Sequence, residues 1–316
     1  MSSLASFTAD YQALLDSCGV IDRSARGKLA LTGSETKLFL QGQVTNDVQR
    51  LQAGTGCYAA FLTPKGKMLG DLRILDTGSE LLLDTERAAL QGLFNLIRRY
   101  AVGYDVTLHK RTVQCGLLSL IGPQALEVAG AQALGQAEHR HLVLEPGGIE
   151  ARAIRTADGI DLLCDAAETD ALREALVASG AVAVSEEAVE CLRIERGRPR
   201  YGVELDDTVI PQEAGLNARA VSFTKGCYVG QETVARLYYR GKPNRHLQGL
   251  RCEAPVFPGD AVHFGERQVA TVASAATSPR LGPIALALVR REAPAGSPVI
   301  VGDSQVAATI TELPFS

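Results

Sequence analysis

The residues of this chain best suited to chemistry lie in one octapeptide, Lys225 to Glu232, which reads Lys-Gly-Cys-Tyr-Val-Gly-Gln-Glu. Its thiol, Cys227, follows an ammonium group by two residues and precedes an expected helix start by three. A nearby cation and the positive end of a helix both favour the thiolate, the reactive form of cysteine. The spacing therefore predicts a reactive thiol, with an ordinary free cysteine in a strand-to-helix turn as the alternative.

The elements that must position these residues begin with two stretches of chain that repeat one order. Hydrophobic periodicity predicts a strand, a helix with Ser34 as its N-cap, a hairpin, a further strand, a helix and a closing strand. These are expected at 28–31, 34–42, 57–62 with 69–75, 80–84, 87–100 and 105–109. The second stretch repeats the order at 113–121, a short helix after Pro123, 141–144, 151–155, 160–164, 169–178 and 181–184. Both read β-α-β-β-β-α-β, which is the ferredoxin-like plan.

The last third of the chain changes character. A helix at 185–195 leads into a long irregular and polar segment that ends at the octapeptide, and a helix is expected at 230–239. Short strands at 246–252, 268–273, 284–289 and 299–301 then indicate a small antiparallel barrel or sandwich. We therefore expect three domains: 1–110 with an N-terminal helix, 111–241 with the cysteine motif, and 242–316.

Charge is unevenly distributed along the 316 residues. The net charge of −4 argues against direct nucleic-acid binding, for which a basic domain is expected. Residues 191–245, however, hold ten Lys or Arg and six Asp or Glu. This basic segment suits an anionic small ligand or one acidic partner, and a solvated surface is the alternative.

Cysteine spacing and hydropathy restrict the class of protein further. The seven cysteines lie at least 25 residues apart and form no C-x-x-C pair, so no local zinc or iron–sulfur site is expected. Reduced thiols and the absence of a leader or of a long apolar run predict a cytoplasmic protein without a membrane span. No P-loop, dinucleotide fingerprint or metalloprotease motif is present.

The octapeptide resembles the signature of the YgfZ family, the folate-binding relatives of the glycine-cleavage T-protein (aminomethyltransferase). The layout from about residue 20 to 316 is similar to that family as well. The resemblance implies an α+β fold of two interleaved ferredoxin-like units followed by a C-terminal small antiparallel β-barrel, around a central cavity. It also implies tetrahydrofolate as the cofactor.

Folate combines a flat pterin, a benzoyl ring and an anionic tail, and binding it requires polar groups, apolar walls and cations. By the resemblance, the run Arg193-Ile194-Glu195 places Glu195 against the pterin, and Tyr201 forms part of the wall. Arg236 and Arg240 are candidates for the carboxylate tail. The alternatives are a surface helix residue for Glu195 and solvated arginines for the other two.

Four further residues are expected to line the folate site by the same resemblance. They are Asn46, Gln212, Gln231 and Glu232. Asn46 has a simpler alternative as a turn residue, and Gln212, with its neighbour Glu213, as a helix cap.

One departure from the T-protein concerns its paired aspartates at the end of the second hairpin strand. The matching positions here are Gly70 and Asp71, so one acid is replaced by glycine. The candidate catalytic groups are therefore Asp71, which suits acid–base work, and Cys227 with Lys225 beside it. Cys227 could attack a one-carbon unit, hold iron or sulfur transiently, or act as a redox-sensitive thiol.

The resemblance implies an accessory protein that uses tetrahydrofolate in assembly or repair of iron–sulfur clusters in client enzymes, including tRNA-modifying ones. The alternative is a folate-dependent aminomethyltransferase or demethylase, with Asp71 as its acid. A third interpretation is a module that stores or senses folate without turnover.

Overall fold

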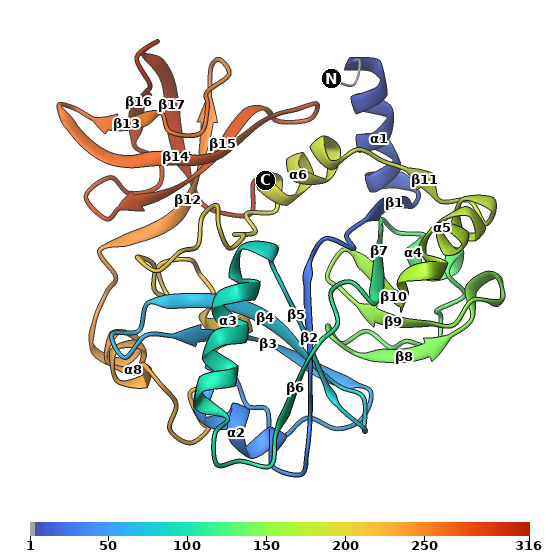
Figure 1. Ribbon diagram of the computed structural model, residues 1–316. Coiled ribbons are helices and arrows are strands. Elements are labelled where there is room, and N and C mark those ends of the chain that lie inside the picture. The colour runs from blue at the N-terminus through green and yellow to red at the C-terminus, as the bar shows by residue number, and fades with distance from the viewer. Residues whose placement is uncertain (1–3) are drawn as a thin grey trace. The chain divides into compact units, whose positions relative to one another are not determined.

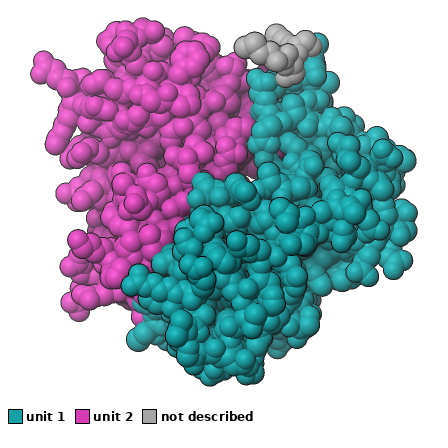
Figure 2. Space-filling model, viewed as in Figure 1, with its two compact units in different colours: residues 1–61, 70–188, 224–228 teal, residues 62–69, 189–223, 229–316 magenta. Residues whose placement is uncertain are grey.

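The computed structural model describes residues 4–316, which form two compact units (Figures 1 and 2). Among these residues, unit 1 comprises 4–61, Gly70–Ala188 and Thr224–Tyr228, and unit 2 comprises Leu62–Leu69, Val189–Phe223 and Val229–Ser316. The segment Thr224–Tyr228, which contains Cys227, therefore belongs to unit 1, whereas the residues on either side of it belong to unit 2. The three-domain division expected from the sequence stays a prediction.

The first sheet of unit 1 has five strands in the order β3-β4-β5-β2-β6. They are β2 (Gly27–Thr32), β3 (Thr55–Leu62), β4 (Met68–Asp76), β5 (Leu81–Thr85) and β6 (Thr107–Lys110), with helices α2 (Thr36–Gln43) and α3 (Arg87–Tyr100). The element order is the predicted one, but the predicted N-cap is wrong. Helix α2 follows Glu35, and the hydroxyl of Ser34 instead donates to Asp105 Oδ2 at 2.7 Å.

The second sheet of unit 1 has the order β11-β1-β7-β10-β9-β8. Its strands are β1 (Gly19–Asp22), β7 (Cys115–Ile121), β8 (His141–Leu144), β9 (Ala151–Arg155), β10 (Gly159–Asp165) and β11 (Val182–Ala183). The helical elements around it are α1 (Leu4–Asp16), α4 (Ala125–Val128), α5 (Thr169–Ala178), η1 (Pro146–Gly148) and η2 (Ala166–Glu168). Strand β1 was not predicted; it pairs with β7 and β11 and lies between them.

Each sheet of unit 1 packs against helices. Helix α3 packs on β2, and α5 packs on β7 over an apolar core that includes Leu118, Leu162 and Leu172. The opposite faces meet through an ion pair: Arg73 of β4 contacts Asp161 of β10 at 2.5 Å. Side chains alternate along a strand, so these charged residues share strands with the apolar residues that face the helices.

A buried network of charges surrounds that ion pair. Asp84 of β5 accepts from both Arg73 (2.7 Å) and Arg26 (2.9 Å), and Ser119 donates to Asp161 at 2.6 Å. Burial would raise the pKa of Asp84, but the two guanidinium groups lower it to about 2. Asp84 is thus ionised at neutral pH, and the network joins strands of both sheets.

Unit 2 contains a closed barrel of six antiparallel strands in the order β12-β15-β14-β13-β16-β17. The strands are β12 (Arg245–Cys252), β13 (Ala261–Phe264), β14 (Arg267–Ser278), β15 (Gly282–Arg290), β16 (Pro298–Val301) and β17 (Val306–Thr311). Strands β13 and β17 were not predicted, and β17 closes the barrel by pairing with β12. Of the two architectures expected, the barrel is therefore the one that forms.

Three helices complete the chain: α6 (Glu186–Glu195), α7 (Asn217–Ala220) and α8 (Gln231–Arg240). Helix α6 leads into the irregular segment, and α8 follows the octapeptide cysteine as predicted. Within residues 4–316, no helix combines the length and the apolar character that crossing a membrane requires.

Candidate functional site

Lys225 anchors the octapeptide to helix α2. Its Nζ donates to the backbone oxygens of Gln41 (2.6 Å), Val44 (2.7 Å) and Asn46 (3.0 Å). All three donors of the ammonium group are therefore used. The C-terminal end of a helix also attracts a cation, which favours this position for the lysine. Burial lowers the pKa of Lys225 to about 8. The structure thus gives this lysine an anchoring contact, and its effect on Cys227 stays a prediction.

Cys227 is exposed, whereas the six other cysteines of the chain are buried or half-buried. The preceding residue, Gly226, is exposed as well, and a Cβ added to it would meet nothing within 4 Å. The thiol is therefore accessible from solvent on a backbone segment that Lys225 holds in place. Those two properties are what a thiol that reacts with another molecule needs.

The second glycine of the octapeptide has a different role. Gly230 is the N-cap of α8 with φ of 84°, a conformation that favours glycine. A Cβ at this position would lie 2.6 Å from the carbonyl oxygen of Thr63 and 3.0 Å from Leu62 Cβ. Glycine is therefore required here by both backbone conformation and the close approach of the β3–β4 hairpin.

Asp71 of β4 is buried, and the hydroxyl of Tyr58 donates to its Oδ2 at 2.5 Å. Burial raises the pKa of Asp71 to about 6, against the hydrogen bond from Tyr58, which lowers it. A carboxyl group that titrates close to neutral pH suits a general acid or base. Tyr58 was not identified from the sequence, because its partner lies thirteen residues away across a hairpin.

Asn46 connects the octapeptide to this acid. Its backbone oxygen accepts from Lys225, and its Nδ2 donates to the backbone oxygen of Tyr58 at 2.9 Å. A continuous series of hydrogen bonds therefore runs from Lys225 through Asn46 and Tyr58 to Asp71. Unit 1 thus brings three of its four predicted site residues into one hydrogen-bonded series, and Cys227 lies two residues beyond the end of it.

Gly70 faces the opposite way from Asp71. A Cβ at position 70 would lie 3.0 Å from Ala89 and from Leu93, both on α3. Because successive residues of a strand point to opposite faces, an acid at position 70 would face the apolar side of α3. The glycine therefore removes no carboxylate from the side on which Asp71 lies.

Glu195, at the end of α6, is buried with 1% of its surface exposed. Arg280 donates to its Oε2 at 3.0 Å, and its backbone oxygen accepts from Phe315 N at 2.9 Å. The alternative of a surface helix residue is therefore wrong. Arg280 was not identified from the sequence, because the two residues are 85 positions apart.

Gln212 presents a buried acceptor. Its Oε1 has no hydrogen-bond partner among residues 4–316, and the same holds for Oδ1 of Asn217. The neighbouring Glu213, by contrast, accepts from Arg245 Nε and from Ile210 N, both at 3.0 Å. Its carboxylate thus links the loop that contains Ile210 to the start of β12. A buried acceptor without a donor costs about 1–3 kcal/mol, which a ligand donor would recover.

Tyr201 lies half-buried in a tight loop. The backbone oxygen of Arg200 accepts from three successive amide groups, those of Val203, Glu204 and Leu205. Glu204 in turn is buried and receives two hydrogen bonds of 3.0 Å from Arg193. The loop that carries Tyr201 is thus supported by a buried ion pair that the sequence did not reveal.

Helix α8 carries the remaining predicted residues. Glu232, Arg236 and Arg240 are exposed, and Gln231 is half-buried. Arg236 and Arg240 are four residues apart and therefore share one face of the helix. Their assignment to a folate tail stays a prediction. In the described part of the chain, no group of three or more His, Cys, Asp or Glu side chains is arranged to hold a metal ion.

Comparisons with known proteins agree with this architecture. Residues 2–225 match the model of the GCVT N-terminal domain, and residues 245–316 match that of the glycine cleavage T-protein C-terminal barrel domain. The structure of glycine cleavage system aminomethyltransferase T from Bartonella henselae superimposes with a TM-score of 0.88 over 100% of this chain and 91% of that one, at 21% identity. The predicted α+β fold with a C-terminal barrel is confirmed.

Two curated relatives carry different names. An aminomethyltransferase from Rubrobacter xylanophilus is 32% identical over 98% of this chain and 86% of its own. A tRNA-modifying protein YgfZ from Colwellia psychrerythraea is 30% identical over 72% of this chain and 70% of its own.

Proposed function

The chain belongs to the glycine-cleavage T-protein family, and on that premise we propose that it is a tetrahydrofolate-binding accessory protein for iron–sulfur enzymes. In this proposal, it acts through Cys227 on assembly or repair of clusters in client enzymes, tRNA-modifying enzymes among them. The observation that carries the proposal is the accessible Cys227 on a segment that Lys225 fixes to α2.

In this proposal, the polar groups of unit 2 bind the pterin. A pterin presents several N–H donors, and unit 2 offers the buried carboxylate of Glu195 and the partnerless Oε1 of Gln212 as acceptors. Tyr201 adds an aromatic wall, and Gln231 and Glu232 add polar groups after the cysteine. Arg236 and Arg240 supply cations for the anionic tail. Tetrahydrofolate, when bound, supplies one-carbon chemistry.

The residues of unit 1 prepare the reacting groups. Lys225 restrains the backbone of Cys227, so the thiol meets a partner from a fixed position. Tyr58 orients the carboxyl group of Asp71, which can hold or release a proton near pH 6. The thiolate of Cys227 would serve as a soft ligand for iron or as a nucleophile.

The relative named tRNA-modifying protein YgfZ supports the accessory role, at 30% identity over 72% of this chain. A cytoplasmic location is part of the proposal, because exposed Cys227 and six further free thiols suit a reducing compartment.

The test measures the activity of iron–sulfur enzymes in cells that lack this protein and receive variants of it. Cys227→Ser should fail to restore cluster-dependent activity, whereas Cys115→Ser, at a half-buried thiol, should restore it. Full restoration by Cys227→Ser would remove the basis of the proposal.

A second candidate is aminomethyl transfer or demethylation with Asp71 as the acid. It is favoured by the buried Asp71–Tyr58 pair, and by the orientation of Gly70, which leaves no acid missing beside Asp71. Purified protein should then transfer a one-carbon unit from a methylamine or an aminomethyl-lipoyl donor to tetrahydrofolate. Asp71→Asn should slow this turnover by about 10²-fold or more, whereas Cys227→Ser should not. Turnover that depends on Cys227 alone would exclude this candidate.

A further inference from the structure

Unit 1 contains a pocket that the proposed folate site does not use. It has a volume of about 360 Å³ and is lined by residues of both sheets. One wall comes from the first sheet, with Glu80, Leu82 and Arg111, and the other from β8, β9 and β10. A volume of this size suits a small metabolite rather than a large cofactor.

The register of the second sheet places an arginine in this pocket. Arg152 of β9 is paired with Val143 of β8 on one side and with Leu163 of β10 on the other. Residues directly opposite each other in a sheet share a face, so these three side chains form one row. The row presents a guanidinium group between two aliphatic side chains.

Arg152 has an unusual partner for a half-buried guanidinium group. Its Nη1 donates to Nδ1 of His141 at 3.0 Å, and Nε2 of His141 faces the backbone oxygen of Thr55 at 3.3 Å. Burial and the charge of Arg152 lower the pKa of His141, so the imidazole is neutral at pH 7. Burial likewise lowers the pKa of Arg152, against the charges of Glu80 and Glu150, which raise it.

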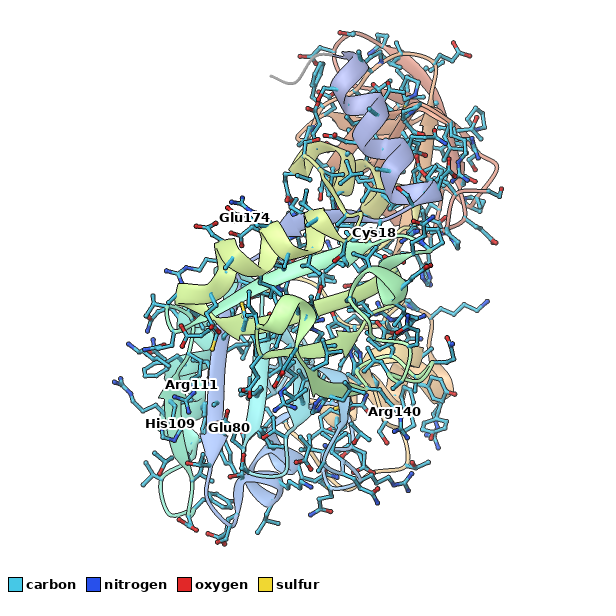
Figure 3. All side chains as sticks on the ribbon, turned by 90° about the vertical axis from the view of Figure 1, so that its right-hand side faces the viewer. Cys18, Glu80, His109, Arg111, Arg140 and Glu174 are labelled. Atoms are coloured by element: carbon cyan, nitrogen blue, oxygen red, sulfur yellow. The ribbon has the colours of Figure 1, made fainter. Side chains whose placement is uncertain are left out.

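No carboxylate lies within 4.0 Å of Arg152 in the part of the chain that the structure describes. The contrast with its neighbour is direct: Arg111, across the pocket, is 3.1 Å from Glu80 (Figure 3). An arginine offers two parallel N–H donors that match a carboxylate or phosphate. The guanidinium group of Arg152 therefore keeps N–H donors that can meet the carboxylate of a ligand in this pocket.

The rest of the lining restricts the ligand. Glu80, Glu150 and Asp165 bring negative charge to the pocket, which disfavours a multiply charged phosphate and favours a cationic group on the ligand. Leu82, Val143 and Leu163 supply aliphatic walls. From the position of Arg152 among these groups, we propose that this pocket binds a free aliphatic amino acid, with its carboxylate on Arg152 and its ammonium group toward the acidic residues.

The test is calorimetric titration of the full chain with L-leucine. Three comparators each remove one feature: 4-methylpentanoate lacks the ammonium group, 3-methylbutylamine lacks the carboxylate, and inorganic phosphate lacks the aliphatic part. L-Leucine should bind, and each comparator should bind at least about tenfold more weakly. Absence of L-leucine binding at about 10 mM, or phosphate binding of equal strength, would overturn the proposal.

Two variants test the assignment to Arg152. Arg152→Gln should weaken L-leucine binding at least about tenfold, whereas Arg155→Gln should leave it unchanged. Arg155 lies on the same strand, but three positions on, and therefore on the opposite face. Tetrahydrofolate affinity should be the same in both variants, which separates this site from the proposed function. Binding that survives Arg152→Gln contradicts the proposal.

A further variant covers the case in which Arg152→Gln does not fold. Glu150 is exposed, so Glu150→Gln leaves the fold intact. It should weaken L-leucine binding without weakening 4-methylpentanoate binding, because only the former carries an ammonium group. Equal effects on both ligands would contradict the orientation of the amino acid.

Discussion

Three consecutive hydrogen bonds link the predicted site residues of unit 1. Lys225 binds the backbone of Asn46, Asn46 binds the backbone of Tyr58, and Tyr58 binds the carboxyl group of Asp71. Lys225 was expected to favour a thiolate at Cys227, yet its donors all meet backbone oxygens at the end of α2. Its measurable contribution is to the position of Cys227.

Asp71 predicts a pH dependence of stability. Its folded-state pKa of about 6 lies above the value of about 3.9 for an ordinary aspartate, so the folded protein holds this proton more tightly. Stability therefore falls as pH rises from about 4 to about 6. Asp71→Asn removes the ionisation, so the variant should match the wild type below about pH 4 and exceed it above about pH 6, by up to about 3 kcal/mol.

Urea unfolding over a series of pH values measures this difference. Asp105→Asn is a suitable control, because Asp105 is exposed and its pKa is lowered by hydrogen bonds from Ser34. Parallel pH profiles of the wild type and Asp71→Asn would contradict the assignment of a raised pKa to Asp71.

At the scale of elements, the order of helices and strands followed from periodicity, because that signal is local. Strand β1 was missed because it is four residues long and pairs only with strands that are distant in sequence. Strands β13 and β17 were missed because they are only four and six residues long, although each forms a hairpin with its neighbour, β14 or β16. The same limit applies to the site. Glu195 and Asp71 were identified, but Arg280 and Tyr58 were not, because a side-chain pair across 85 or 13 residues leaves no periodic pattern.

The two glycines of the octapeptide allow a matched comparison. Gly230 has φ of 84°, and a Cβ there would lie 2.6 Å from the oxygen of Thr63. Gly230→Ala should therefore reduce the free energy of unfolding by about 2–4 kcal/mol. Gly226→Ala should change it by less than about 0.5 kcal/mol, because its Cβ would stand in open space.

Denaturant unfolding of both variants checks this expectation. If Gly226→Ala is as unstable as Gly230→Ala, the expectation that position 226 tolerates a Cβ is wrong.

At the scale of the whole molecule, composition excluded classes of ligand and partner but did not identify the function. A net charge of −4 and widely spaced cysteines restricted the classes of ligand and partner, but the function depends on groups that the fold collects. Unit 1 holds the anchored thiol and the titrating acid, and unit 2 holds the buried carboxylate of Glu195 and the acceptor of Gln212. In the proposed function, the groups of unit 2 bind tetrahydrofolate and those of unit 1 supply the reactive groups.

The central claim is that the chain binds tetrahydrofolate through Glu195 and keeps Cys227 for a separate chemical role. Calorimetric titration with tetrahydrofolate of the wild type, Glu195→Gln and Cys227→Ser tests it most directly. The account predicts affinity of about micromolar order for the wild type and for Cys227→Ser, with a loss of at least about tenfold in Glu195→Gln. No binding to the wild type would show that the fold is retained without the ligand, and would contradict the account.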